Sequence, residues 1–177
     1  MVERMLSSPI VLPVLRSAGA ALALLITVLS APLAWAGEDA AASNAAPVKT
    51  QVNDANAKKQ LLGEHLLTLQ WITPDNGPTG KAQVTEENGL LKLKGSQRDA
   101  KGNYLTVEGV IETVDTRSFV LVGKVELSVD FLAGGKPCPR EGRFTFRITG
   151  KRRYWRMKEM NNPCEENHVD YVDLFLR

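Results

Sequence analysis

From His65 to the end of the chain, apolar and polar residues alternate in short runs that are separated by turn residues. A period of two is the signature of a strand with one buried face. In the longest run, alternate residues from Phe119 to Phe131 are expected to share one side. Eight strands are predicted in this way: 65–72, 81–86, 90–95, 104–114, 118–132, 143–149, 154–160 and 168–176.

Eight short runs with almost no helix predict a single all-β domain. We expect an eight-stranded antiparallel up-and-down barrel, with a two-sheet sandwich as the alternative. Every link is short enough for a hairpin, and Gly109 and Gly123 within two long runs suit the bends of a small barrel. Links that follow odd-numbered strands would lie at one end. Because these links are the longer ones, a binding mouth is expected there.

The segment that precedes the first run predicts a short helix. In "QVNDANAKKQLLG", Asn53 or Asp54 is a suitable N-cap and Gly63 a suitable end. Residues 37–52 are rich in alanine and asparagine and show no apolar period, so they are predicted to be a disordered linker. The barrel domain is therefore expected to span residues 53–177.

Residues 1–36 are typical of a signal peptide. Arg4 and Arg16 supply positive charge before an uncharged stretch that begins at Ser17. Ala34 and Ala36 then fit a small-x-small cleavage site. Cleavage after Ala36 would leave no stable membrane anchor. The alternative is an uncleaved anchor, because the uncharged stretch approaches the length of a membrane span. Either outcome directs the domain out of the cytoplasm, and a periplasmic or secreted location is predicted.

The two cysteines, Cys138 and Cys164, are expected to form one disulfide in an exported chain. Closing a loop of roughly 27 residues corresponds to about 3.5 kcal/mol in the chain-entropy model. The cysteines fall in the links after the fifth and seventh strands, and these links would lie at the same end of a barrel. A free redox pair is the alternative, but the C-x-x-C spacing of such pairs is absent.

Charge gives little support to a nucleic-acid partner. Removing residues 1–36 would reduce the formal net charge from +2 to +1, and such a near balance argues against a polyanion binder. The stretch "GKRRYWRMKEMNNPC" does combine basic and aromatic residues. We assign it instead to a tight turn and a strand in which Trp155 and Met157 share one face.

No catalytic motif is present, so neither an enzyme nor a cofactor is expected. Glu165 and Glu166 lie beside His168, but adjacent glutamates in a loop are usually solvated. A metal site built from soft ligands would use His65, His168, Met157 and Met160, and the two histidines are too remote in sequence to indicate one.

The last strands carry charges of both signs. Asp170 and Asp173 are close in strand order to Arg147, Arg153 and Arg156. We interpret these residues as a solvated face whose ion pairs contribute about 0–1 kcal/mol each.

The stretch "LLGEHLLTLQW" and the strands after it resemble the lipocalin-like (calycin) barrels. In that group a short helix precedes a first strand that opens with Gly-x-Trp, and a basic residue near the last strands packs over the tryptophan. Gly63 matches the glycine, whereas His65 stands at the tryptophan position and Trp71 is six residues later. The resemblance implies Arg156 or Arg177 as the basic partner.

The chain is also similar to short, uncharacterised exported proteins of proteobacteria. The similarity is carried by "GGKPCPREGRFTFRITGKRRYWRMKEMNNPC" and by the ending "DYVDLFLR". It implies a two-cysteine β-domain in the same compartment and no particular activity.

These observations predict an exported, non-enzymatic protein that binds a small hydrophobic ligand in the barrel interior or mouth. The same residues would line the interior if they simply filled the core. The alternative is a periplasmic protein-binding module or envelope enzyme inhibitor that acts through the disulfide-tied loops 133–142 and 161–167. The expected partner is thus a small apolar ligand or an envelope protein. The predicted lining residues are Leu69, Trp71, Leu91, Val107, Val125, Phe144, Phe146 and Trp155.

Overall fold

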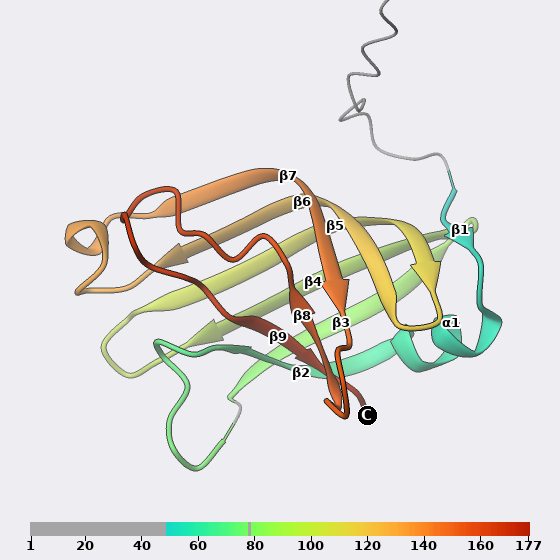
Figure 1. Ribbon diagram of the computed structural model, residues 1–177, viewed down its shortest axis with the longest axis horizontal. Coiled ribbons are helices and arrows are strands. Elements are labelled where there is room, and N and C mark those ends of the chain that lie inside the picture. Colours follow the sequence, from blue (N-terminus) through green and yellow to red (C-terminus); the bar gives the residue numbers. More distant parts are fainter. Residues whose placement is uncertain (1–48, 78) are drawn as a thin grey trace, which may run out of the picture. The chain divides into compact units, whose positions relative to one another are not determined.

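The computed structural model describes residues 49–77 and 79–177, which form a β-barrel with one short helix (Figure 1). The predicted signal peptide, 1–36, and most of the predicted linker, 37–52, lie outside the described residues. Residues 51–52, which the sequence assigns to the linker, form strand β1 (Gln51–Val52), and β1 pairs in parallel with the end of β5.

Eight antiparallel strands close the barrel in the order β5-β4-β3-β2-β9-β8-β7-β6, and β6 returns to β5. The predicted fold class is confirmed, including closure as a barrel. The strands are β2 (Gly63–Leu69), β3 (Gly80–Glu87), β4 (Leu90–Arg98), β5 (Tyr104–Asp115), β6 (Ser118–Ser128), β7 (Cys138–Arg147), β8 (Tyr154–Met157) and β9 (Val172–Phe175).

The barrel has two different ends. The helix end carries α1 (Ala55–Leu61), the chain's approach to β2 and the turns that follow β3, β5 and β7. The loop end carries the connections that begin at Gln70, Asp99, Val129 and Lys158. The longer links do gather at this second end, as the alternation of strand directions predicts.

Several strand boundaries differ from the prediction. Strands β8 and β9 are three to five residues shorter than the predicted runs 154–160 and 168–176, and two further differences affect the loop end. Strand β6 stops at Ser128, so Phe131 leaves the barrel wall and is 61% exposed, although its spacing placed it on the buried side. Strand β7 begins at Cys138, so the second half of the predicted loop 133–142 is part of the wall. The sequence did not predict this part of the strand, because Pro139 and Gly142 are residue types typical of turns.

Helix α1 closes the helix end of the barrel. Its N-cap is Asp54, which accepts hydrogen bonds from the backbone N–H groups of Asn56 and Ala57, and the bond from Ala57 holds the pKa of that carboxyl below its ordinary value. At the other end of the helix, His65 is buried. Its ring nitrogens lie 2.7 Å from the carbonyl oxygen of Leu61 and 2.8 Å from that of Phe175, so the imidazole joins the helix to β9.

Two contacts at the helix end involve the residues that carry the resemblance to lipocalin-like barrels. His65 occupies the tryptophan position and its ring meets Trp155 edge-on at 5.9 Å. The guanidinium of Arg177 covers Gly63, where an added Cβ would lie 2.7 Å from Arg177 Nη1. Of the two candidate basic partners, Arg177 therefore has the position over the opening of the first strand, and Arg156 lies on the outer face.

A row of glycines crosses the barrel wall where the long strands bend. Gly109, Gly123 and Gly142 are register partners on β5, β6 and β7. An added Cβ on Gly123 would overlap the carbonyl oxygen of Glu108 on the neighbouring strand. These strands approach so closely that a side chain does not fit between them.

We expect Gly123→Ala to lower the free energy of unfolding by about 1–3 kcal/mol, because the added methyl group must push two strands apart. The measurement is a urea unfolding curve. Ser118→Ala, half-buried in the same strand, is the control and should change stability by less than about 0.5 kcal/mol. Equal stability of the two variants would contradict the close approach.

Candidate functional site

Seven of the eight predicted ligand-lining residues belong to one packed hydrophobic core. Leu69, Leu91, Val107, Val125, Phe144, Phe146 and Trp155 are each less than 5% exposed and belong to the same cluster. The eighth, Trp71, is half-buried at the loop end and packs against the cluster from outside. Phe119 stacks on Phe146 at 4.9 Å and meets Trp155 edge-on, so aromatic rings fill the interior near the helix end.

The largest hollows described lie on the outside of the wall. One cavity of about 700 Å³ is lined by residues of β2–β5, among them Leu66, Lys81 and Lys94, and by the chain end 175–177. Another, of about 750 Å³, follows the outer side of the glycine row. Among five such cavities, only Val107 of the eight predicted residues contributes to a lining. The predicted residues thus have the positions of core residues.

The loop end is held together by a covalent bond. Cys138, at the first position of β7, forms a disulfide with Cys164 in the connection between β8 and β9, as predicted. The bond is needed at this place because β8 pairs with β7 at only two registered positions, Phe146↔Met157 and Arg147↔Arg156. Beyond them the chain from Lys158 to Tyr171 crosses the gap as an irregular strap, which we call the strap segment.

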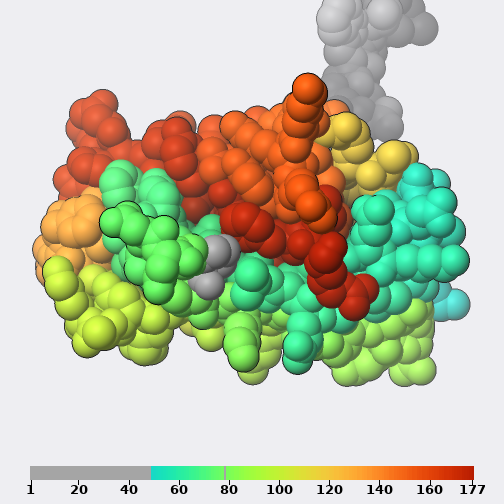
Figure 2. Space-filling view, turned by 90° about the horizontal axis from the view of Figure 1, so that it is seen from below, coloured from blue at the N-terminus to red at the C-terminus, as the bar shows by residue number. Residues whose placement is uncertain are grey.

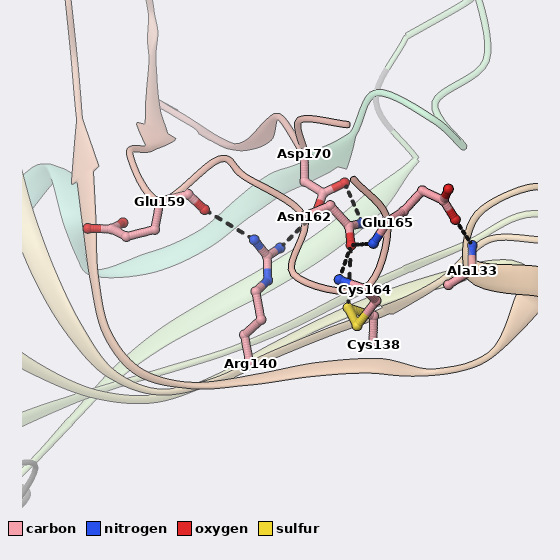
Figure 3. The surroundings of a disulfide bond; sticks show 8 residues. All are labelled: Ala133, Cys138, Arg140, Glu159, Asn162, Cys164, Glu165 and Asp170. Atoms are coloured by element: carbon pink, nitrogen blue, oxygen red, sulfur yellow. Dashed lines mark hydrogen bonds and ion pairs between the residues drawn. A yellow bond between two sulfur atoms is a disulfide. The ribbon is translucent and has the colours of Figure 1, made fainter. Parts of the chain in front are cut away.

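A buried ion pair closes the same gap (Figure 3). Arg140 extends from β7 toward the strap segment, where its Nη2 lies 3.3 Å from Asp170 Oδ2 and its Nη1 donates to the carbonyl oxygen of Glu159 at 3.1 Å. Both side chains are at least nine-tenths buried. Burial lowers the pKa of the Arg140 guanidinium, and the charges of Asp170 and Glu159 oppose that change.

Asp170 is the centre of this polar cluster. Its Oδ1 accepts hydrogen bonds from Trp71 Nε1 at 2.9 Å and from Asn162 Nδ2 at 3.3 Å, while Asn162 Oδ1 accepts from the backbone of Cys164 and Glu165. The sequence placed Asp170 on a solvated face, which is wrong. The carboxylate is needed inside because it neutralises the one arginine of the inner wall.

Asp173 does pair with Arg156, as the strand order suggested. The guanidinium donates from Nε and Nη2 to both carboxylate oxygens at 2.7 Å and lies 4.1 Å from the ring centre of Tyr171. Asp173 is only 6% exposed, so this pair is half-buried on the outer face instead of solvated. The bond to Asp173 raises the pKa of Arg156.

Three aromatic rings form a continuous surface across the loop end. Phe131 meets Trp71 edge-on with ring centres 5.8 Å apart, and Trp71 lies 6.0 Å from His168. Each ring comes from a different connection, and Figure 2 shows these green, orange and red loops gathered on one side of the molecule. We call Phe131, Trp71 and His168 the aromatic surface.

The loop that presents Phe131 is firmly held. The backbone N–H of Asp130 donates to Asn103 Oδ1, and that of Ala133 donates to Glu165 Oε2, both at 2.8 Å. Ala133 has a left-handed backbone with φ 47°, followed by Gly134 and Gly135, which also have positive φ. Such a conformation costs about 1–3 kcal/mol at a non-glycine residue and persists only where neighbours enforce it. Phe131 is therefore exposed on a fixed support.

Glu165 thus has a structural partner, and the acid–base arrangement with His168 is not assembled, since that ring bonds to the carbonyl of Glu166. His65 and His168 lie at opposite ends of the barrel. Among residues 49–77 and 79–177, no three His, Cys, Asp or Glu side chains come together as a metal site would require. In that same part of the chain, no helix has the length and apolar character to cross a membrane.

Comparison with known proteins places the described barrel in a family. The model of the PM1083 family matches residues 49–176. The "Uncharacterized protein PM1083" of Pasteurella multocida (strain Pm70) is 37% identical over 118 residues, which cover 67% of this chain and 74% of the relative. No solved structure matches.

The buried pair predicts strong coupling between its members. Asp170→Asn should lower the free energy of unfolding by about 3–5 kcal/mol, because the charge of Arg140 is then buried without a counter-charge. Replacing both, as Arg140→Met with Asp170→Asn, should cost less than the sum of these two single changes in a double-mutant cycle. Lys92→Gln, which breaks the exposed pair with Glu87, is the control and should cost about 0–1 kcal/mol. Additive losses would contradict the coupling.

The packed interior predicts that Phe146→Ala lowers the free energy of unfolding by about 3–5 kcal/mol, since the stacked ring leaves a cavity. Native mass spectrometry of the purified protein, beside a denatured sample, is the second measurement and should show equal masses. A small molecule that is present only in the native sample, and is lost in the variant without loss of stability, would instead indicate an interior ligand.

Proposed function

This chain belongs to the PM1083 family, and we propose that it is an exported, non-enzymatic binding protein whose loop end captures another protein of the cell envelope. The observation that carries the proposal is the exposure of Phe131 on a rigid, disulfide-tied support. Exposed aromatic rings on fixed backbones are typical of the residues that contribute most to protein interfaces.

The support of this ring is the reason to favour a protein partner. A loop that is already ordered loses little conformational entropy on binding, and affinity rises accordingly. Phe131 is supported at its base by Trp71, whose indole N–H is fixed by the buried Asp170. The disulfide and the Arg140–Asp170 pair hold the strap segment that carries His168. All three rings are thus preorganised.

The position of the other candidate residues also supports a surface site. A small apolar ligand in the interior would have to displace rings that already stack on one another, such as Phe119 and Phe146. A partner protein at the loop end requires no such rearrangement. Trp71, Phe131 and His168 lie outside the predicted loops 133–142 and 161–167. These two loops support the surface through the hydrogen bond from Ala133 N–H to Glu165.

Export is supported by two features of different kinds. Residues 1–36 have the pattern of a signal peptide, and the domain contains a disulfide, a bond that persists in oxidising compartments. A periplasmic or secreted protein meets its partners outside the cytoplasm, which directs the search to envelope proteins.

The test is site-specific photo-crosslinking in the bacterium that makes the protein. A photoreactive phenylalanine analogue at position 131 should form a covalent adduct with one protein. The same analogue at Leu66, which is 45% exposed on the outer wall, should not. Phe131→Ala should weaken binding of the identified partner by at least about tenfold while the unfolding midpoint stays unchanged, because the ring is mostly exposed.

Two outcomes would contradict the proposal. Equal crosslinking from positions 131 and 66 would show that the aromatic surface has no partner of its own. A small-molecule adduct at position 131, in place of a protein, would assign the same surface to a small apolar ligand.

A further inference from the structure

The helix end of the barrel carries a concentration of positive charge that the proposed function does not use. The residues come from α1, from the turns after β5 and β7, and from the end of the chain, and all six are exposed. We call them the basic surface: Lys59, Arg117, Lys151, Arg152, Arg153 and Arg177.

These cations have no carboxylate partner. None of the seven ion pairs among the described residues includes one of them. Two carboxylates near the same end are engaged elsewhere, since Glu86 pairs with Lys58 and Glu112 with Arg143. A third, Glu64, is exposed and belongs to none of the described ion pairs. The net charge of the whole chain is only +2, so the positive charge is a local property of this end.

The basic surface is displayed on a fixed backbone. Arg117 donates from Nη2 to the carbonyl oxygen of Gly150 at 2.6 Å and from Nε to that of Ile148 at 3.3 Å. Arg152 donates to Thr149 Oγ1, and the N–H of Leu176 donates to the carbonyl oxygen of Arg153. The turn after β7 is therefore tied to two neighbouring segments, and its three basic side chains are exposed.

The surface is also hollowed. A cavity of about 400 Å³ is lined by Lys59, Gln60, Arg153, Leu176 and Arg177, and its lining contains three basic side chains and no acidic side chain. In Figure 2 the dark red end of the chain lies beside the cyan segment that contains α1, which is where this cavity opens. An anionic headgroup would meet several cations at once there.

The chain joins the barrel at this end. Strand β1 pairs with Thr113 and Val114 near the end of β5, and the N–H of Thr50 donates to the carbonyl oxygen of Gly89 in the turn after β3. The sequence before it contains the uncharged stretch 17–36. If this stretch were retained as the uncleaved anchor, the basic surface would be at the end of the barrel that is nearest to the membrane along the chain.

We propose that the basic surface binds the phosphate-bearing headgroups of anionic lipids on a membrane leaflet, with the loop end directed away. Clusters of several Lys and Arg residues next to a membrane are attracted by anionic lipids within about one Debye length, roughly 10 Å at 0.1 M salt. This orientation would present the aromatic surface to proteins of the envelope.

The test uses the protein as purified from the envelope, with its N-terminus determined by mass. Cosedimentation is measured with vesicles of phosphatidylcholine alone and with vesicles that contain about 30% phosphatidylglycerol. Binding to the anionic vesicles should be at least about tenfold stronger and should fall as salt is raised. The triple change Lys151→Gln, Arg152→Gln and Arg153→Gln should remove that preference.

A matched control removes the same charge elsewhere. Lys81→Gln, Lys94→Gln and Lys136→Gln alter three exposed lysines of the wall and loop end, and the preference for anionic vesicles should stay within about twofold. Equal loss in both triple variants would overturn the proposal, as would equal binding to the two kinds of vesicle. Displacement by inorganic phosphate alone would also overturn it, in favour of a site for a small anion. The Phe131→Ala variant should bind anionic vesicles as strongly as the unchanged protein. A failed vesicle test therefore does not bear on the proposed function, and a failed crosslinking test does not bear on lipid binding.

Discussion

The barrel depends on how its one incomplete seam is closed. Between β7 and β8 the backbone supplies only two registered pairs, and over the remaining length of β7 the wall is completed by side chains. The disulfide and the Arg140–Asp170 pair both join β7 to the strap segment. An arginine inside a barrel is costly unless a counter-charge is buried with it, so the position of Asp170 is dictated by Arg140. That carboxylate then fixes Trp71, and with it the aromatic surface.

Most of the barrel wall could be predicted from the sequence, the first half of β7 being the main exception. Period-two alternation is strong in residues 104–114 and 118–128 because each strand has one buried and one outer face, and the direction of successive strands alone places both cysteines at one end. The short helix could also be predicted from the sequence, because Asp54 is a suitable N-cap whose side chain satisfies two backbone N–H groups.

The candidate site could be predicted less well from the sequence than the barrel wall, for physical reasons. Phe131 continues the apolar alternation of β6 by spacing alone, and only the left-handed backbone of Ala133 to Gly135 shows that the strand has already ended. The pattern "DFLAGG" carried that signal, because two glycines after a strand indicate a turn. Arg140 lies between Pro139 and Gly142, which look like a loop. No local pattern links it to an aspartate thirty residues later, so the buried pair required the fold.

Strand β9 has a consequence for the order in which the protein is assembled. It is four residues long, yet Leu174 is the register partner of both Leu67 on β2 and Trp155 on β8. Nearby, the N–H of Tyr171 donates to Gln70 across 101 positions of sequence. Both neighbours of β9 are open edges until the last residues arrive, and contacts so remote in sequence form slowly. The barrel therefore cannot close before residues 172–175 have been synthesised.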